Sequence, residues 1–398
     1  MVQTRSRSDE VRAALPVTRN VAYLNTGTAG PLPEASLRAM REMQERELHE
    51  GRSNIQGFLD FRDMLDLMRV RLGGMFGCDA AEVAVTHHTT EGMNIALWGM
   101  RWHAGEEIVT TSLEHIGGLG PIYALQSRFG VKPVIVECGE TGEGALDAIT
   151  NALTERTRAV ALSHVSYSTG YVLPVKEIAR RAHAAGALVI VDGAQSAGVI
   201  PLDLHDLGVD AYAMPGQKWL CGPEGTGALY VAAAAMDRVG PTFTGGFSFE
   251  SFDELGVYAF QPDARRFEVG SVYRPALAAM NESTRWIAEE VTLPWAYGRI
   301  QEVAAYCRRA LEGLEGIDIM TPPGPQAGLV TITFPGWEGM AVSEEMADRG
   351  IVIRPITRPA GVRVATGFYN TEEEIDRLVT ALREVQTLEP HEPRVTLH

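Results

Sequence analysis

One lysine and one aspartate have the residue types and the spacing for catalysis with a pyridine-based cofactor. Asp192 ends the apolar run Leu188–Val191, and Lys218 follows a second apolar run, Ala211–Met214. Each run predicts a buried parallel strand, and open α/β sheets place their ligands at the carboxyl ends of such strands. A lysine amine can form a Schiff base with pyridoxal 5'-phosphate, while a carboxylate keeps the pyridine nitrogen protonated so that the ring accepts electrons. The pair therefore predicts pyridoxal phosphate chemistry.

Each of these residues has an ordinary structural interpretation when it is taken alone. An aspartate after a strand is usually a helix cap, and a lysine at a strand end is usually solvated. Here Gln195 lies three residues after the aspartate, and the aromatic Trp219 is next to the lysine. The combination favours a catalytic site over two unrelated surface residues.

The motifs around these residues are similar to those of a known family. D-G-A-Q-S-A-G, from Asp192, and G-Q-K-W, from Gly216, resemble the class V aminotransferase family of fold-type I pyridoxal phosphate enzymes. The similarity runs from about Asn25 to Asp376, which is nearly the whole chain. That family includes cysteine desulfurases, cystine and cysteine-conjugate C–S lyases, and isopenicillin N epimerase-like proteins.

The resemblance also implies which residues bind the cofactor. Thr89 and Thr90 match the family's phosphate-binding turn, and free amides at a helix start favour phosphate on physical grounds as well. His115 matches the imidazole that stacks on the pyridine, from where it could exchange protons with the substrate. Gln195 and Gln217 complete the cofactor-binding set within the chain.

Two positions depart from the family's pattern. Most relatives have histidine directly before the lysine, whereas this chain has Gln217, which can donate an amide N–H to phosphate but cannot be a cation. Cysteine desulfurases typically carry H-V-N-N-E-T-G where this chain has Ser166, Tyr167 and Ser168. The second departure changes groups that touch the cofactor and the substrate in the family.

Further matches concern the substrate and a second subunit. Arg363, before the N-T-x-E-E-I-D run, matches the arginine that binds the substrate α-carboxylate in a bidentate fork, and Arg354 is a second candidate. Asn25, with Gly27, matches a segment that lines the substrate end. Ser271, in R-F-E-x-G-S, matches a residue that reaches the phosphate of the neighbouring subunit's cofactor, which implies a homodimer with sites at the interface.

Alternating apolar runs and helical patterns predict an α/β fold, and the resemblance implies fold type I, with a mostly parallel, seven-stranded sheet flanked by helices. We expect an N-terminal segment (1–20), a large cofactor-binding domain (21–292) and a smaller α+β domain (293–398). In the smaller domain the pattern predicts strands at Ile317–Met320 and Val352–Arg354. Helices are expected at Ile95–Trp98 and Gly120–Phe129, after the two cofactor-binding turns.

Composition limits the partners and the compartment. The net charge of −16 argues against nucleic acid or an anionic membrane surface as a partner. The four cysteines show no CxxC spacing, and the adjacent His87 and His88 should point apart on a turn, so no metal site is expected. The N-terminus lacks the apolar stretch of a signal peptide, and no apolar run could span a bilayer, so we expect a cytoplasmic protein. The expected partner is a small-molecule substrate, an amino acid.

The reaction type is predicted by excluding alternatives, and three reaction types remain possible. A persulfide-forming cysteine desulfurase needs a cysteine on a mobile loop of the small domain, and this chain has none after Cys307. Elimination of sulfur from cystine or a related cysteine derivative, giving pyruvate and ammonia, needs no protein thiol and fits best. Epimerisation or transamination of an amino acid remains an alternative.

Overall fold

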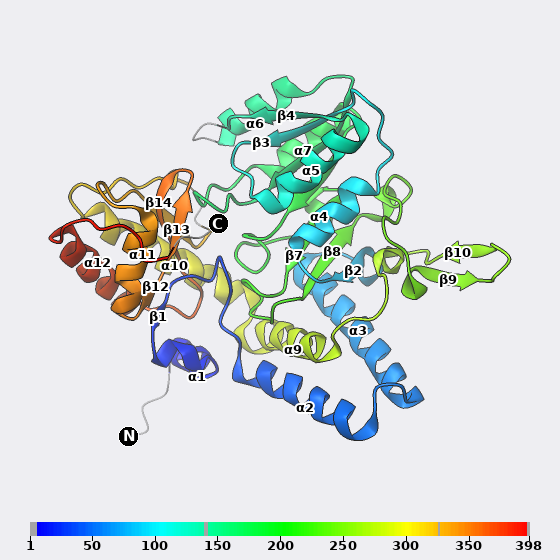
Figure 1. Ribbon diagram of the computed structural model, residues 1–398, viewed down its shortest axis with the longest axis horizontal. Helices are drawn as coiled ribbons and strands as arrows, with labels where there is room; N and C mark the ends of the chain where they lie inside the picture. Colours follow the sequence, from blue (N-terminus) through cyan, green and yellow to red (C-terminus); the bar gives the residue numbers. More distant parts are fainter. Residues whose placement is uncertain (1–5, 139–141, 325–326, 396–398) are drawn as a thin grey trace.

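A seven-stranded sheet is the framework of the larger lobe (Figure 1). The computed structural model describes residues 6–138, 142–324 and 327–395. Within the described chain the strand order is β2-β8-β7-β6-β5-β3-β4, and β8 alone runs antiparallel to its neighbours. The predicted α/β fold with a mostly parallel seven-stranded sheet is therefore confirmed. The strands are β2 (Val83–Thr86), β3 (Glu107–Thr111), β4 (Lys132–Val136), β5 (Thr157–Ser163), β6 (Leu188–Asp192), β7 (Ala211–Pro215) and β8 (Gly227–Val231).

Helices cover both faces of this sheet, which explains why its central strands are largely apolar. In β6, Leu188 and Ile190 pack into one core cluster, whereas Val189 and Val191 pack into the other. Successive side chains of a strand point to opposite faces, so a strand covered on both sides has no polar positions. The helices of the larger lobe are α2 (Glu34–Glu50), α3 (Ile55–Phe76), α4 (Thr89–Trp98), α5 (Ile116–Phe129), α6 (Gly142–Ala152), α7 (Val175–Ala184), α8 (Leu204–Leu207) and α9 (Arg274–Arg285).

The smaller lobe is built on a three-stranded antiparallel sheet with its own apolar core. The predicted strand at Ile317–Met320 is wrong, because only an isolated bridge joins Ile319 to Ile332 there. The strand expected at Val352–Arg354 is two strands that pair with different partners. The elements are α10 (Leu293–Glu312), β11 (Leu329–Ile332), α11 (Gly339–Asp348), β12 (Ile351–Val352), β13 (Arg354–Thr357), β14 (Ala360–Ala365) and α12 (Glu372–Gln386).

The beginning of the chain is joined to the smaller lobe. After α1 (Arg7–Ala13), the short strand β1 (Ala22–Tyr23) pairs in parallel with β12, and Asn25 forms a bridge to Ala365. The segment after β1 therefore passes beside both lobes before α2 begins. The domain boundary at residue 293 stays a prediction.

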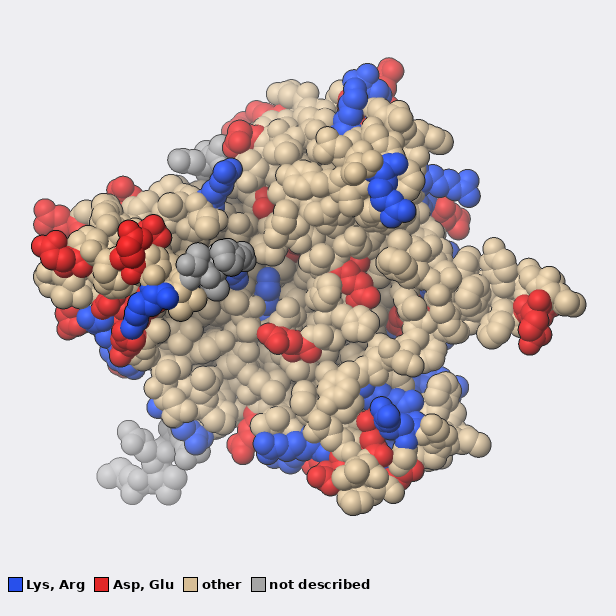
Figure 2. All heavy atoms as spheres, viewed as in Figure 1, with Lys and Arg blue, Asp and Glu red and all other residues tan. Residues whose placement is uncertain are grey.

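Two surface features complete the fold. A hairpin of β9 (Phe249–Phe252) and β10 (Tyr258–Phe260) projects from the larger lobe (Figure 1). On the face drawn in Figure 2, acidic and basic side chains are interspersed, and acidic ones gather over the lobe that carries α11 and α12. Among the described residues, no helix is both long enough and apolar enough to cross a membrane.

Candidate active site

Lys218 and Asp192 meet at the carboxyl edge of the large sheet. Asp192 is the last residue of β6, Lys218 follows the end of β7 by three residues, and the two strands are parallel neighbours. Both side chains line one cavity of about 360 Å³. Its wall consists of His88, Thr89, Thr90, His115, Ser163, Val165, Tyr167, Asp192, Ala194, Gln195, Gln217, Lys218, Glu224, Gly225 and Arg354.

The cavity changes the acid–base properties of both central residues. Burial lowers the pKa of the Lys218 amine to about 8, and the positive charges of Arg363 and Arg354 act in the same direction, while Asp192 opposes them. Burial raises the pKa of the Asp192 carboxyl, which Lys218 and a hydrogen bond of 2.8 Å from the Ala194 N–H partly offset. A neutral amine is a nucleophile, so this environment prepares Lys218 to attack an aldehyde near neutral pH.

His115 lies on the loop between β3 and α5, with a defined ring orientation. Its Nδ1 accepts the Gly117 N–H at 3.0 Å, and the Tyr167 ring meets it edge-on, with 4.9 Å between centroids. Burial, followed by the positive charge of Lys218, lowers the pKa of His115 to about 4, so the ring is neutral at pH 7. The Gly117 bond then assigns the proton of the neutral ring to Nε2.

The loop that carries His115 is anchored by a buried carboxyl group. Glu114 accepts hydrogen bonds from the Thr111 hydroxyl and from both the N–H and the hydroxyl of Ser163, at 2.5 to 2.7 Å. Burial raises the pKa of Glu114 to about 7, although these donors oppose the shift. Glu114 thus ties the end of β3 to the end of β5, directly before His115.

One end of the cavity has the properties of a phosphate site. The helix α4 begins at Thr89, so Thr89 and Thr90 form its first turn, six residues earlier than the predicted start at Ile95. Two buried oxygens at this end have no hydrogen-bond partner among the described residues: Thr89 Oγ1 and Gln217 Oε1. Buried polar atoms are normally paired. The Thr89 hydroxyl and the free amides of the helix can donate, so they suit an anionic ligand, whereas the Gln217 amide oxygen can only accept and needs a donor.

The turn that contains Gly27 and Gly30 closes against the lysine loop. A Cβ atom at Gly30 would lie 1.9 Å from the Lys218 carbonyl oxygen, and the Gly30 N–H donates to the Gln217 carbonyl at 2.7 Å. Gln195 donates to the Gly27 carbonyl at 2.8 Å and accepts from the Trp219 indole at 3.0 Å. Both ends of the Gln195 amide therefore hold the wall of the cavity together.

Two arginines lie at the other end, beside this turn. Arg354 and Arg363 are directly opposite each other on β13 and β14. The Thr28 hydroxyl accepts from both guanidinium groups, at 3.1 and 3.2 Å, and donates to Asn25 Oδ1 at 2.7 Å. Like charges directly opposite across a ladder destabilise a sheet, so this end favours an anionic ligand between or beside them.

The two arginines differ in exposure. Arg354 forms part of the cavity wall, whereas Arg363 is fully buried and donates to the Tyr167 carbonyl at 2.7 Å. Burial, with the neighbouring Arg354 charge, lowers the pKa of Arg363 to about 9. The Arg363 Nε has no partner among the described residues. Asn25 is linked to the two arginines through the Thr28 hydroxyl, which donates to Asn25 Oδ1.

Ser271 lies apart from the other predicted site residues. It lines a separate cavity of about 230 Å³, together with His87, Glu91 and Phe247. The single chain therefore does not bring Ser271 to Lys218. The role predicted for it, toward the cofactor of a second subunit, is compatible with this position and remains a prediction.

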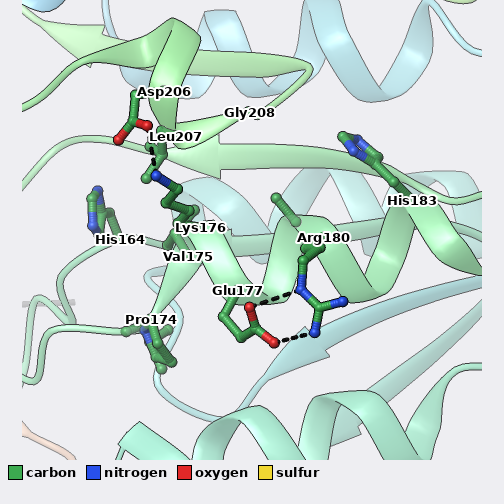
Figure 3. A pocket seen from close by; sticks show the side chains of 12 residues that line it. His164, Pro174, Val175, Lys176, Glu177, Arg180, His183, Asp206, Leu207 and Gly208 are labelled. Atoms are coloured by element: carbon green, nitrogen blue, oxygen red, sulfur yellow. Dashed lines mark hydrogen bonds and ion pairs between the residues drawn. The ribbon is translucent and has the colours of Figure 1, made fainter.

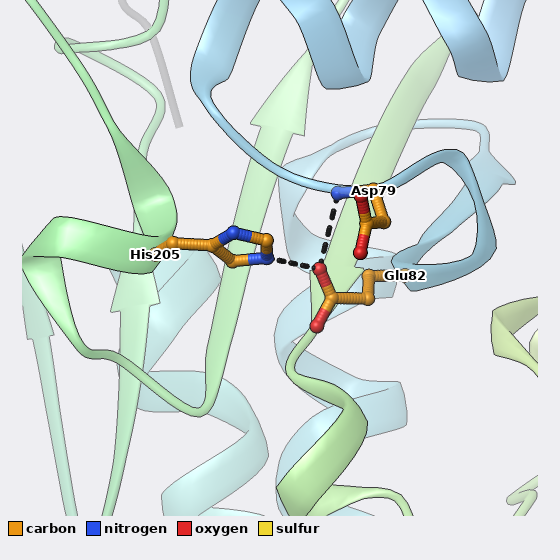
Figure 4. A group of neighbouring side chains, drawn as sticks. All are labelled: Asp79, Glu82 and His205. Atoms are coloured by element: carbon orange, nitrogen blue, oxygen red, sulfur yellow. Dashed lines mark hydrogen bonds and ion pairs between the residues drawn. The ribbon is translucent and has the colours of Figure 1, made fainter.

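A wider cavity of about 560 Å³, beside α7, has no features of a catalytic site (Figure 3). Its charged side chains already pair with one another: Lys176 with Asp206 at 2.5 Å, and Arg180 with Glu177. Figure 4 shows a similar situation for Asp79, Glu82 and His205. Both carboxylate oxygens of Glu82 accept hydrogen bonds, including one of 2.5 Å with His205 Nε2 and one of 2.8 Å from the Ala233 N–H, so this cluster stabilises the fold locally.

Sequence reasoning missed His88, Ser163 and Glu224 in the cavity wall, and Thr28, which contacts the two arginines beside it. Thr28 was treated as part of a glycine-rich turn, because nothing in the local sequence announces partners 326 and 335 positions away. The only hint that the sequence offers at Thr28, directly after Gly27, is its hydroxyl. Tyr167 was noted as a departure without an assigned role.

The family is established by comparison with known proteins. The model for aminotransferase class V matches residues 22–378, and the chain belongs to this family. Among curated relatives, a probable cysteine desulfurase of Methanothermobacter thermautotrophicus is 28% identical, covering 95% of this chain and 98% of the relative. A probable cysteine desulfurase 2 of Mycobacterium leprae is 30% identical, covering 94% and 95%.

Solved structures agree in fold. A C-DES mutant with glycine covalently linked to the PLP cofactor superposes with a TM-score of 0.87 at 30% identity, covering 93% of this chain and 98% of that one. A complex of the cystine C–S lyase C-DES with its reaction product, cysteine persulfide, gives the same TM-score and identity, with 92% and 98% covered. The predicted fold type and family are thereby confirmed, and the chain is a pyridoxal phosphate-dependent enzyme.

The residues of the cavity fit this cofactor. The orphaned Thr89 hydroxyl and the α4 amides suit its phosphate, Asp192 suits a protonated ring nitrogen, and Lys218 suits its aldehyde. Once bound, the cofactor supplies an electron-accepting ring that stabilises negative charge at the substrate Cα.

Proposed function

We propose that the enzyme is a C–S β-lyase acting on cystine or a related cysteine derivative. The reaction removes the Cα proton and breaks the Cβ–S bond, and the sulfur leaves with the bonding electron pair. With cystine the leaving group is cysteine persulfide, and addition of water to the remaining fragment gives pyruvate and ammonia. The observation that carries the proposal is the pair of facing arginines, Arg354 and Arg363, beside the lysine cavity.

The paired arginines suit a substrate with two carboxylates. A single α-carboxylate needs one guanidinium fork, which Arg363 matches by its motif. Arg354, which reaches the cavity wall itself, is then free for a second anionic group farther along the substrate. Cystine has two carboxylates, one on each side of its disulfide, whereas cysteine and alanine each have a single carboxylate.

The cysteines of the chain support sulfur release without a protein persulfide. A sulfur acceptor must be a thiolate within reach of the substrate. Burial raises the pKa of Cys221 and of Cys307 to about 12, and both side chains are fully buried. Burial raises the pKa of the buried Cys138 to about 11 and that of the half-buried Cys78 to about 12, and neither lines the Lys218 cavity. These environments disfavour the persulfide-forming mechanism of a cysteine desulfurase.

The remaining residues supply orientation and proton transfer. Burial lowers the pKa of the Lys218 amine to about 8, so its free base could accept the Cα proton of a bound substrate. The neutral His115, held by Gly117 and Tyr167, covers one side of the cavity and excludes water there. Asp192, buried at the end of β6, would hold the ring nitrogen and keep it protonated, because a charge pair is strong in a buried environment.

A four-product assay tests the proposal against its alternatives. The purified enzyme is offered cystine, cysteine and alanine in turn, and pyruvate, ammonia, persulfide and D-amino acid are measured separately. Pyruvate and ammonia in equal amounts from cystine support the lyase. Inverted stereochemistry without elimination indicates an epimerase, and amino transfer to an added keto acid indicates an aminotransferase; either result contradicts the proposal. Lys218→Ala should bind cofactor and substrate but not turn over.

We also propose that the enzyme acts as a homodimer. The part of the surface around Ser271 carries apolar side chains that water reaches in the single chain, among them Tyr273 at 57% and Phe243 at 68% exposure. Large exposed apolar areas on soluble proteins commonly mark interaction surfaces. Light scattering of the purified enzyme should give twice the mass of the chain, and Ser271→Ala should weaken cofactor binding only in the dimer. A monomer with full activity would contradict this part of the proposal.

A further inference from the structure

The adjacent residues His87 and His88, which precede α4, line two different cavities. His87 lines the same cavity as Ser271, whereas His88 lines the cofactor cavity together with Thr89 and Gln217. Consecutive residues in extended conformation point to opposite sides, which accounts for the separation. His88 has no part in the functions described so far, although it stands at the phosphate end.

The hydrogen bonds of the helix start define the state of the His88 ring. His88 is the N-cap residue of α4, and its Nδ1 accepts the Glu91 N–H at 3.1 Å. An accepting Nδ1 has a free lone pair, so the ring is neutral and its proton is on Nε2. The ring therefore offers one N–H donor beyond the atom that caps the helix.

The neighbouring histidine keeps a negative charge away from this end. The Glu91 carboxylate bonds to the His87 backbone N–H and, at 2.9 Å, to the His87 ring. Glu91 is thus held on the side of His87, although its N–H is bonded to His88. The phosphate end would otherwise have a carboxylate in the first turn of the helix that binds the anion.

We propose that His88 donates its Nε2–H to the phosphate of the cofactor. Neither Gln217, which directly precedes the lysine, nor Thr89 can carry a positive charge, and each leaves a buried oxygen without a partner in the described structure. The donors that the chain can supply here are the α4 amides, two hydroxyl groups, one side-chain amide and the His88 ring. This assignment depends on the cofactor and not on which reaction the enzyme catalyses.

A substitution at His88 can separate the capping role from the phosphate contact. Asparagine is among the best N-cap residues, so His88→Asn keeps an acceptor for the Glu91 N–H but is too short to offer the distal N–H. His87→Asn is the matched control on the other cavity. The apoenzyme of each variant is titrated with pyridoxal phosphate and with pyridoxal, which lacks the phosphate, and its melting temperature is recorded.

We expect His88→Asn to weaken pyridoxal phosphate binding by about tenfold, as for one hydrogen bond to a charged group, while pyridoxal binding stays within about twofold. The melting temperature of the apoenzyme should not change, and the ³¹P resonance of the bound cofactor should move in His88→Asn but not in His87→Asn. An unchanged ratio of the two affinities would overturn the assignment. So would an equal loss for both ligands, because His88 would then only shape the turn, for example by contacting Glu224.

Discussion

The two ends of the cofactor cavity, in the roles that we propose for them, would bind negative charge by opposite means. The phosphate end relies on the α4 amides and neutral side chains, with Thr89 and Gln217 still lacking partners for buried oxygens. The carboxylate end has two full positive charges, Arg354 and Arg363, opposed across one ladder. A permanently bound anion can be held by many neutral donors in fixed positions, because it needs to be bound only once. A substrate that enters and leaves in every cycle has to be attracted and oriented each time, which long-range charge achieves.

The largest expected effect comes from removing the buried charge at the carboxylate end. Arg363→Ala takes away the guanidinium that donates to the Tyr167 carbonyl and leaves the Thr28 hydroxyl with Arg354 as its guanidinium donor. We expect kcat/KM for any amino acid substrate to fall by at least about a hundredfold, as for the loss of a buried charged contact, with cofactor affinity nearly unchanged. Steady-state kinetics and cofactor titration on the same preparation measure both. If the variant lost cofactor affinity by the same factor as kcat/KM, the two ends of the cavity would not have separate roles.

Arg354 should separate substrates by their number of carboxylates. In Arg354→Gln we expect KM for cystine to rise about thirtyfold, within the range for one charge-assisted contact, while KM for a substrate with a single carboxylate changes less than about threefold. Parallel kinetics with cystine and S-methylcysteine test this. If KM rises equally for both substrates, Arg354 contacts the α-carboxylate or only contributes to the positive potential of the cavity. That result would weaken the case for a substrate with two carboxylates.

Thr28 should act by positioning the arginines. Thr28→Val removes the hydroxyl that both guanidinium groups share but keeps the volume. We expect KM to rise about tenfold with a smaller change in kcat, because the arginines lose their common acceptor. Thr28→Ser should restore most of the affinity, whereas a merely structural role would lower the melting temperature in proportion to the kinetic loss. Thr380→Val, a hydroxyl removed from the exposed side of α12, serves as the control.

The smallest expected effect is on the pKa of Lys218, which the charges of Arg354 and Arg363 help to lower. Burial, aided by the two arginines, lowers the pKa of Lys218 to about 8, so the neutral amine increases as pH rises through 8 and is the main form above it. The rate at which the apoenzyme captures pyridoxal phosphate should therefore rise about tenfold per unit below pH 8 and level off above it. Arg354→Gln should move this midpoint upward by a fraction of a unit, and His88→Asn should not move it. Stopped-flow absorbance across pH 6 to 10 measures the profile.

The sequence was sufficient for the large sheet and for most of the cofactor side of the cavity. Strands covered on both faces, such as β6, are continuous apolar runs, and Asp192 and Lys218 follow such runs directly. Their meeting follows from the rule that parallel strands end at one edge. The helix starts were placed too late, since α4 begins at Thr89 and α5 at Ile116. Histidine caps and glycine-rich first turns look like loop when only local helix propensity is considered.

The carboxylate end could be predicted only in part, for a physical reason. Arg363 was identified through its motif, but its meeting with Arg354 and Thr28 depends on antiparallel register and on the pairing of β1 with β12. The strand Ile317–Met320 failed because an apolar alternation does not guarantee a partner along its whole length, and here one bridge is formed. Contacts between the first thirty residues and the last sixty have no local signature.

The pairing of β1 with β12 has a consequence for how the enzyme matures. Asn25 and Thr28 are among the first residues to leave the ribosome, yet their partners on β13 and β14 are synthesised more than three hundred residues later. The large sheet, whose strands all lie before Val231, can assemble before those partners exist. A nascent or C-terminally truncated chain should therefore acquire its cofactor while still unable to select an amino acid, which makes substrate recognition the last property that this polypeptide gains.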